Sequence, residues 1–375
     1  MNRKKHGYAA LRIAAVALGA ALLALGGCTS KVEQPQEEEI PDLVWPLPPE
    51  QPRVRYIGSY RFRKDVEEDI NRGRVLDSLL GQEQGTGESL KKPQGVHADK
   101  DGRIFVADTG WGKVVVFDRE NKSFAFWGRE GRGSLDKPIA VTSDDSGRVY
   151  VTDVVQRRVV VFDRDGNYIS AIGGQGELAA PTGIGLDDAR QRIYVVDTKK
   201  HRIAVFDFDG RLVSTMGERG NGPVQFNYPT HLATDRDGRI YVSDSMNFRV
   251  QIIDPDGKLL KAFGENGRDL GQFSRVKGIA VDSEGHIYVV DAAFNNFQIF
   301  TRDGKLLLYV GSVGPNPGQF WLPAGAYIDR QDRIYVADQY NFRIQVFQFL
   351  GEQVDAPAPA EAPAAIPAPA EAPVQ

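Results

Sequence analysis

Three short aspartate-glycine strings are the first places in this sequence where chemistry could occur. They resemble the start of a calcium-binding loop and read Asp99-Lys-Asp101-Gly102, Asp235-Arg-Asp237-Gly238 and Asp254-Pro-Asp256-Gly257. None of them completes the loop pattern with its downstream bidentate glutamate. Each string also lies between stretches rich in valine, isoleucine and aromatic residues, where aspartate and glycine favour a tight hairpin. The strings therefore predict turns.

Histidine is the second residue type that could hold a metal. His231 differs from its counterparts, because the matching positions of five related segments are Gly95, Ala140, Gly183, Gly278 and Gly325. Two interpretations stay open: a side chain that projects into a central space, or a loop histidine hydrogen-bonded to backbone. A catalytic zinc needs about three protein ligands, and only His97 offers a second histidine near the same level. We therefore expect no metal cofactor, with zinc or calcium kept for the alternative below.

Aspartate and arginine recur together along most of the chain. The aspartates are Asp108, Asp153, Asp197, Asp244, Asp291 and Asp338, spaced 45, 44, 47, 47 and 47 residues apart. Five residues after an aspartate come Arg158, Arg202, Arg249 and Arg343, with Lys113 in the first unit. An arginine can tie such a carboxylate to loop carbonyls. Recurrence in unit after unit predicts a role in the architecture.

The elements that position these residues form a unit repeated six times. Each unit starts at a proline, or at Val276 in the fifth, and holds four short strands separated by aspartate and glycine. Four strands in a repeat of this length are typical of a propeller blade. The sequence thus predicts an all-β, six-bladed β-propeller over residues 53–350, with four antiparallel strands in each blade.

The repeated residues resemble the NHL family. Asp244-Ser-Met-Asn247-Phe248-Arg249 and Asp338-Gln-Tyr-Asn341-Phe342-Arg343 match its central stretch, and Phe263 to Phe273 match its glycine-rich link. The fifth unit departs most, with Val276 for proline and Asn296 for arginine. The sixth unit lacks a fourth strand, so we expect residues 53–60 to complete the last blade and close the ring.

Both ends of the chain are expected to lie outside the propeller. Residues 1–27 combine a basic start with an apolar run and resemble a bacterial lipoprotein signal peptide that ends before Cys28. Lipidation of Cys28, by palmitate or a related acyl chain, would anchor the protein in the cell envelope, with the outer membrane favoured. Residues 28–52 predict a Pro/Glu-rich tether, 65–81 a helical insertion, and 351–375 a disordered Ala/Pro-rich tail.

Aromatic residues give the strongest indication of binding. Those that differ between repeats and fall in loops are Trp111, Phe294, Trp321 and Tyr340. Aromatic and arginine clusters are common anchors of recognition. By contrast, Phe226, Phe273 and Phe320 follow the repeated link and are expected to wedge between blades. We predict Trp111, Phe294, Tyr340, Trp321 and His231 as candidate binding residues.

These features favour a binding or scaffold module without catalysis, for an envelope protein, a peptide or a glycan. Nucleic acid is excluded as a partner, because loss of residues 1–27, with four basic and no acidic side chains, takes the net charge from −4 to −8. The alternative is a metal-dependent lyase or hydrolase at the channel mouth, similar to the amidating-lyase propellers. The chain lacks the histidine set that this resemblance requires.

Overall fold

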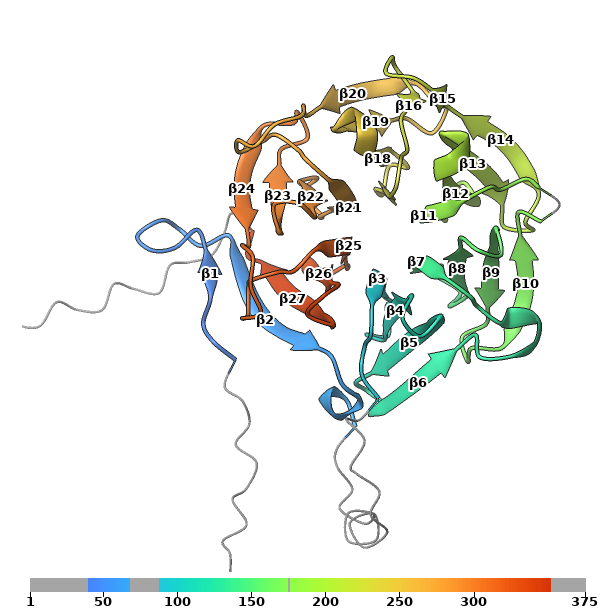
Figure 1. Ribbon diagram of the computed structural model, residues 1–375, viewed down its shortest axis with the longest axis horizontal. Helices are drawn as coiled ribbons and strands as arrows, with labels where there is room; N and C mark the ends of the chain where they lie inside the picture. The colour runs from blue at the N-terminus through green and yellow to red at the C-terminus, as the bar shows by residue number, and fades with distance from the viewer. Residues whose placement is uncertain (1–39, 68–87, 175, 352–375) are drawn as a thin grey trace, which may run out of the picture. The chain divides into compact units, whose positions relative to one another are not determined.

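The computed structural model describes residues 40–67, 88–174 and 176–351. The described residues from Pro41 onward form one compact unit. Six blades of four antiparallel strands lie around a central axis as a propeller, and the sheet of one blade carries a fifth strand (Figure 1). The expected fold class is confirmed. The signal peptide, Cys28, most of the insertion and nearly all of the tail lie outside the described residues.

The first three blades follow the chain from the inner strand outward. Blade 1 is β3 (Pro93–Ala98), β4 (Ile104–Asp108), β5 (Lys113–Asp118) and β6 (Ser123–Trp127). Blade 2 is β7 (Pro138–Ser143), β8 (Val149–Asp153), β9 (Arg158–Phe162) and β10 (Tyr168–Ile172). Blade 3 is β11 (Pro181–Asp187), β12 (Arg192–Asp197), β13 (Arg202–Asp207) and β14 (Leu212–Met216).

The last three blades repeat this order. Blade 4 is β17 (Leu232–Thr234), β18 (Ile240–Asp244), β19 (Arg249–Ile253) and β20 (Leu259–Phe263). Blade 5 is β21 (Val276–Val281), β22 (Ile287–Asp291), β23 (Asn296–Phe300) and β24 (Leu306–Val310). Blade 6 takes β25 (Pro323–Ile328), β26 (Arg333–Asp338) and β27 (Arg343–Phe349) from the end of the repeats.

The fourth strand of blade 6 comes from the other end of the propeller. β2 (Val54–Tyr60) pairs antiparallel with β27, which confirms the closing strand expected at 53–60. One more strand, β1 (Val44–Trp45), pairs with β2. The ring of Trp45 packs edge-on against Phe347, with 5.7 Å between centroids. An aromatic residue of the segment predicted as a tether at 28–52 thus packs on the last blade.

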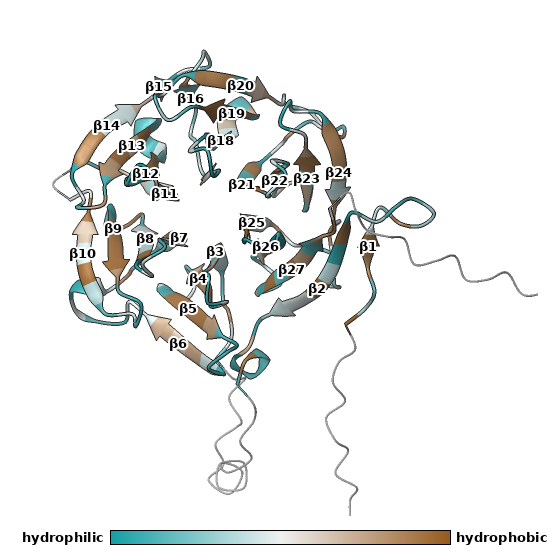
Figure 2. Cartoon of the chain, turned by 180° about the vertical axis from the view of Figure 1, so that it is seen from behind, coloured by the Kyte–Doolittle hydropathy of each residue, from teal (hydrophilic) through white to brown (hydrophobic). Residues whose placement is uncertain are grey.

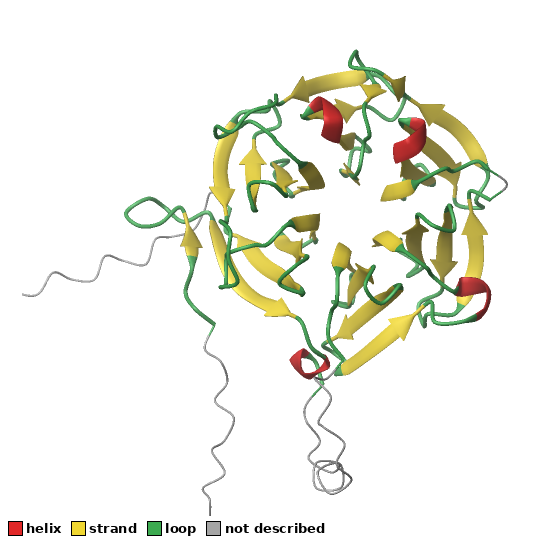
Figure 3. Cartoon of the chain, viewed as in Figure 1, coloured by secondary structure: helices red, strands yellow, loops and turns green. Residues whose placement is uncertain are grey.

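Short elements complete the described part of the chain. A parallel pair, β15 (Glu218–Arg219) and β16 (Gln225–Phe226), lies in the link between blades 3 and 4. Figure 3 shows four 3-10 helices, η1 (Arg63–Asp65), η2 (Gly131–Gly133), η3 (Thr198–Lys200) and η4 (Ser245–Asn247). Of the insertion expected at 65–81, only 65–67 are described, so the helix predicted there stays a prediction.

The core lies between neighbouring blades. The middle strands are the most apolar parts of each blade, while loops are hydrophilic (Figure 2). Three link phenylalanines, Phe226, Phe273 and Phe320, are fully buried in separate core clusters, which confirms them as wedges. A β-carbon on Gly264 would lie 2.4 Å from the ring of Phe273, so the link glycine is needed for the wedge to fit.

The aspartate-glycine strings form the predicted turns. In the hairpin of blade 1, one oxygen of Asp99 accepts the backbone N–H groups of Asp101 and Arg103 at 3.0 and 2.9 Å. Gly102 has a φ of +77°, which glycine adopts at little cost. The carboxylates thus satisfy turn donors of their own hairpins.

Candidate functional site

Two faces of the propeller differ in the loops that they carry. The link face carries the links into each inner strand and the loops between the second and third strands of each blade, such as 109–112 and 339–342. The hairpin face carries the hairpins between first and second strands, such as 99–103 and 235–238. A cavity of about 860 Å³ runs along the axis, walled by all six inner strands.

The strand-ending aspartates hold the links together. Asp338 is fully buried and accepts from the backbone of Trp321 and from the side chains of Asn341, Arg343 and Gln345. Arg343 also donates to the carbonyls of Asn316 and Gln319, both at 2.8 Å. Burial raises the pKa of Asp338 against the opposing effect of these donors.

We call this arrangement, an arginine that joins the strand-ending aspartate to link carbonyls, the arginine fork. Blade 4 has the same fork, in which Arg249 donates to Asp244 and to link carbonyls. In blades 2 and 3 the prediction needs correction, because Arg158 and Arg202 reach only the carbonyls of their links. Their buried Nε atoms have no partner among the described residues. Asn296 replaces the arginine in blade 5, and its buried Oδ1 is likewise without a partner in the described part of the chain.

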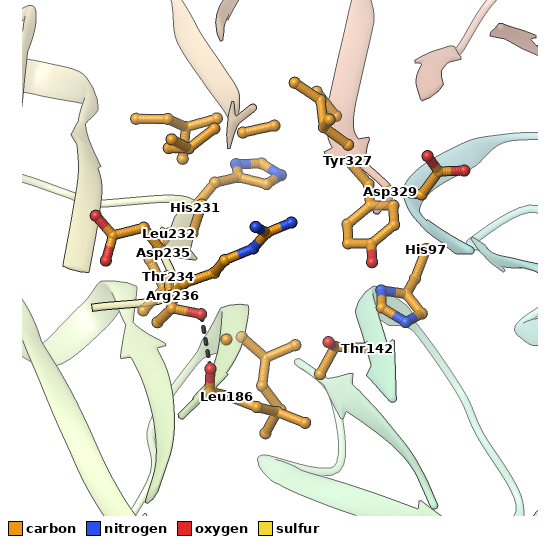
Figure 4. Close-up of a pocket in the computed structure, with 18 of the residues that line it drawn as sticks. His97, Thr142, Leu186, His231, Leu232, Thr234, Asp235, Arg236, Tyr327 and Asp329 are labelled. Atoms are coloured by element: carbon orange, nitrogen blue, oxygen red, sulfur yellow. Dashed lines mark hydrogen bonds between the residues drawn. The ribbon is translucent and has the colours of Figure 1, made fainter. Parts of the chain in front are cut away.

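His231 lines the cavity near its link-face end, and Figure 4 shows its imidazole directed into the enclosed space. The residue is only 8% exposed, and neither ring nitrogen has a hydrogen-bond partner among the described residues. Burial, helped by the charge of Lys277, lowers the pKa of His231 to about 3. The interpretation as a loop histidine bonded to backbone is therefore wrong.

The inner strands approach closely at the position of His231. A β-carbon built on Gly183 would lie 2.7 Å from the Cα of His231, and one on Gly278 would lie 2.5 Å from the backbone nitrogen of Ala326. Glycine is thus the residue that fits this position in most blades. β17 starts only at Leu232, whereas the other five inner strands start at the residue equivalent to Pro229.

Two further polar residues, Ser243 and Lys277, lie near His231, and the sequence analysis did not predict them as candidate binding residues. Ser243 lies opposite His231 in the sheet, donates its N–H to the carbonyl of His231 at 3.0 Å, and has a buried hydroxyl without a partner among the described residues. Lys277 is the second residue of the next inner strand, β21, and burial together with Arg275 lowers its pKa. Comparing position 277 across the repeats would have found it, because the equivalents Gln94, Ile139, Thr182, Thr230 and Ala324 are all uncharged.

The opposite wall of the cavity is already hydrogen-bonded. His97 contacts the hydroxyl of Ser143 at 2.8 Å and packs at a tilt against Tyr327, with 4.2 Å between ring centroids. Burial lowers the pKa of His97 to about 3. Arg236 reaches into the cavity from the hairpin face in Figure 4 and has no ion-pair partner in the described residues. His97 and His231 therefore line one cavity but differ in how their nitrogens are satisfied.

Trp321 and Tyr340 come together on the link face of blade 6. Their ring centroids are 5.9 Å apart, and the residues are 53% and 40% exposed. The ammonium of Lys92, from the start of blade 1, lies 5.7 Å from the ring centroid of Tyr340. These two predicted residues form an exposed aromatic pair beside a cation.

Trp111 and Phe294 are placed differently. Trp111 is half-buried: its indole donates to the carbonyl of Ser89 at 2.7 Å, and Lys91 lies 3.4 Å from its ring centroid. Phe294 is half-buried in the loop of blade 5 that Asp291 caps, apart from the pair on blade 6. Lys91 and Lys92 are consecutive, so one pair of lysines contacts both the ring of Trp111 in blade 1 and the ring of Tyr340 in blade 6.

The closing segment adds residues that sequence reasoning did not place here. Arg61 follows β2 and lies 5.9 Å from the ring centroid of Phe342 and 4.9 Å from that of Phe62. We call Arg61, Lys92, Trp321, Tyr340 and Phe342 the aromatic–cation cluster. Ring closure brings its members together, so no local sequence pattern reveals it.

Within the described residues, no group of three or more histidine, cysteine, aspartate or glutamate side chains is placed to hold a metal ion. No helix there is long and apolar enough to cross a membrane.

Comparisons with known proteins agree with the fold. Residues 184–250 match a family described as 6-bladed beta-propeller, and residues 273–301 and 320–347 match the NHL repeat. Each family covers less than half of the chain. A search of curated proteins found no match. The chain is a six-bladed propeller with NHL repeats.

Solved structures of similar fold have diverse descriptions. Virginiamycin B lyase from Staphylococcus aureus is 14% identical with a TM-score of 0.52, over 69% of this chain and 96% of that one. An auxiliary nutrient binding protein from Bacteroides thetaiotaomicron is 13% identical with a TM-score of 0.56, over 69% of both chains. Identities this low show the fold alone, so function must come from the site.

Proposed function

We propose that this protein is a lipid-anchored recognition module of the cell envelope, which binds a protein, peptide or glycan partner without catalysis. The aromatic–cation cluster is the observation that supports it. Trp321 is more than half exposed although it is a large apolar side chain, and its ring pairs with Tyr340. Exposed aromatic rings flanked by cations are common anchors of recognition.

The charge of the cluster favours an acidic partner. Arg61 and Lys92 have no carboxylate in salt-bridge range among the described residues. A partner segment that carries carboxylates beside an apolar group would meet both features. The anchor at Cys28 is proposed from the sequence alone. Mass spectrometry of the membrane-extracted protein should find acyl chains on Cys28, and their absence would overturn this part.

The binding proposal is tested with Trp321→Ala and Tyr340→Ala in pull-downs from envelope extracts of the source cell, with bound proteins identified by mass spectrometry. We expect each substitution to reduce the recovery of a specific partner at least tenfold. Matched controls are Val155→Ala and Met246→Ala, which remove similarly exposed apolar side chains from the equivalent loops of blades 2 and 4. Equal loss in all four variants, or no loss in the cluster variants, would contradict the proposal.

A metal-dependent lyase or hydrolase centred on His231 is the second candidate. Its support is a buried imidazole with two unpartnered nitrogens on the wall of the central cavity. Elemental analysis of purified protein decides it. Stoichiometric zinc or calcium that is lost in His231→Ala would establish the enzyme candidate, whereas metal-free, folded protein would remove it.

A further inference from the structure

The seam between blades 4 and 5 holds polar side chains that the fold itself does not use. Both nitrogens of His231 and the hydroxyl of Ser243 are buried without a partner among the described residues. Lys277, across the seam, is partly buried and has neither an ion pair nor a hydrogen bond among the described residues. Unpaired buried polar groups cost roughly 1–3 kcal/mol each. A cluster of them therefore needs an explanation outside the fold.

His231 and Ser243 share one side of blade 4, and Lys277 of the next inner strand is close enough for its charge to lower the pKa of His231. His231 and Ser243 are equivalent to Gly95 and Ala107, which are register partners in blade 1. Partners in an antiparallel pair have Cβ atoms about 4.5–5.5 Å apart on one face of the sheet. The side of blade 4 that they occupy faces blade 5, because the hydroxyl of neighbouring Ser245 donates to the carbonyl of Val276 at 2.8 Å.

In blade 2 the residue equivalent to Ser243 forms hydrogen bonds within the fold. Thr152, the equivalent of Ser243, accepts from the backbone of Ala140 at 3.0 Å and donates to the carbonyl of Thr182 in the next blade at 2.8 Å. The hydroxyl there ties two blades together. Ser243 makes neither contact in the described residues, so its hydroxyl is left for another partner.

The chemistry of the cluster selects the partner. Lys277 supplies a positive charge, and the serine hydroxyl and one imidazole N–H supply two more donors. These donors outnumber the acceptors beside them, which are the second imidazole nitrogen and the serine oxygen, and a negative oxygen group would accept from the donors. We propose that the seam between blades 4 and 5 binds a small carboxylate, which Lys277 pairs by charge and His231 and Ser243 hold by hydrogen bonds.

Of the three side chains, His231 lines the central cavity, near its link-face end, so the cavity is the proposed route to the site. A carboxylate there could come from a peptide C-terminus or from a small organic acid. This proposal does not depend on the aromatic–cation cluster, because it uses different blades and different residues. Loss of one site should leave the other intact.

Isothermal titration with the complete lipid-free chain at pH 7 tests the site. The probes are N-acetyl-triglycine with a free carboxylate, the same peptide as its C-terminal amide, and propionate. We expect at least one carboxylate to bind, and the amide to bind at least tenfold more weakly than the free peptide acid. Peptide acid bound more tightly than propionate would indicate a peptide end, and the reverse a small organic acid.

The variants take residues that the chain itself carries at the same position in other blades, which keeps the propeller foldable. Lys277→Gln copies Gln94, His231→Ala copies Ala140, and Ser243→Ala copies Ala107 and Ala337. We expect the affinity for the carboxylate to fall at least tenfold in Lys277→Gln, about fivefold in His231→Ala and about threefold in Ser243→Ala. The charge control is Lys137→Gln, an exposed lysine just before the first strand of blade 2.

No binding of either carboxylate at millimolar concentration overturns the proposal. So does equal binding by the wild type and a folded Lys277→Gln variant, as judged by circular dichroism. If Lys277→Gln fails to fold, the two milder variants still decide, because unchanged affinity in both would exclude the site.

Discussion

The two seams of blade 5 follow one backbone plan but differ inside. Toward blade 6, Arg343 joins Asp338 to two link carbonyls, and the inner strands meet through glycine. Toward blade 4, Asn296 replaces the arginine, and His231 replaces the small residue found at that position in the other blades. The first seam satisfies the polar groups of its fork, whereas the second leaves several unpartnered among the described residues.

The difference indicates which seam of a repeat protein could bind a ligand. A satisfied seam contributes to stability, because its buried polar groups have partners. An unsatisfied seam costs stability, since buried polar groups lose water without gaining a partner. Blade 5 thus has a structural seam on one side and a candidate ligand seam on the other.

The largest effect should come from the structural seam. Asp338→Ala leaves the buried guanidinium of Arg343 without its counter-ion, so we expect the free energy of unfolding to fall by about 3–5 kcal/mol. Asp291→Ala, its counterpart, removes a carboxylate that accepts only backbone N–H groups among the described residues and should cost about 1–3 kcal/mol. Urea denaturation at pH 7 measures both. Equal losses would break the comparison.

Acid should act on the ligand seam through His231. Its pKa is about 3 in the folded protein against 6.5 as the ordinary value, so the unfolded chain binds one more proton between those pH values. Stability is therefore lost as the pH falls below 6.5. From pH 6.5 to pH 5 the wild type should lose about 2 kcal/mol more than His231→Ala. Urea denaturation at both pH values checks this, and parallel losses would show that the histidine is not buried neutral.

Asn296→Arg should give the seam between blades 4 and 5 the arginine that the seam between blades 5 and 6 has. A guanidinium there has Asp291 and the carbonyl of Gln272 as partners, as Arg343 has Asp338 and Gln319. We expect a gain of about 1 kcal/mol in the free energy of unfolding. The gain should vanish when Asp291→Ala is added, which a double-mutant cycle measures. A destabilised Asn296→Arg variant would mean that the seam lacks space for the fork.

The smallest effect belongs to the exposed surface. Trp321→Ala should change the free energy of unfolding by less than about 0.5 kcal/mol, because its ring is largely in solvent. Phe320→Ala, one residue earlier, should cost about 3–5 kcal/mol because it removes a buried wedge. Thermal unfolding of both variants compares them. A large loss in Trp321→Ala would assign that tryptophan to the core.

Much of the fold was predictable, because each blade repeats its own local instructions. Aspartate-glycine turns, alternating strand residues and the link glycines appear in successive units, so six blades could be counted. The closing strand was also predictable, since one unit lacked its outer strand. β1 was not, because a two-residue strand has no pattern of its own and depends on the contact between Trp45 and Phe347.

The candidate sites were predictable only in part. Asymmetry between repeats pointed to His231, Trp321 and Tyr340, and the structure places the first in the cavity and pairs the other two. The same criterion selected Trp111, whose indole donates to the carbonyl of Ser89 in the segment before blade 1. Exposure and hydrogen bonding depend on neighbours that the sequence does not name.

The sequence by itself determined the repeat, the strand order and the residues at each repeated position, because backbone hydrogen bonding and turn chemistry act between near neighbours in the chain. Tertiary structure decided which residues meet across seams. The charge of Lys277 acts on His231 from the next blade, and Lys92 reaches Tyr340 only because the ring closes. Those contacts join residues far apart in the chain, and a pattern that repeats within each blade carries no information about them.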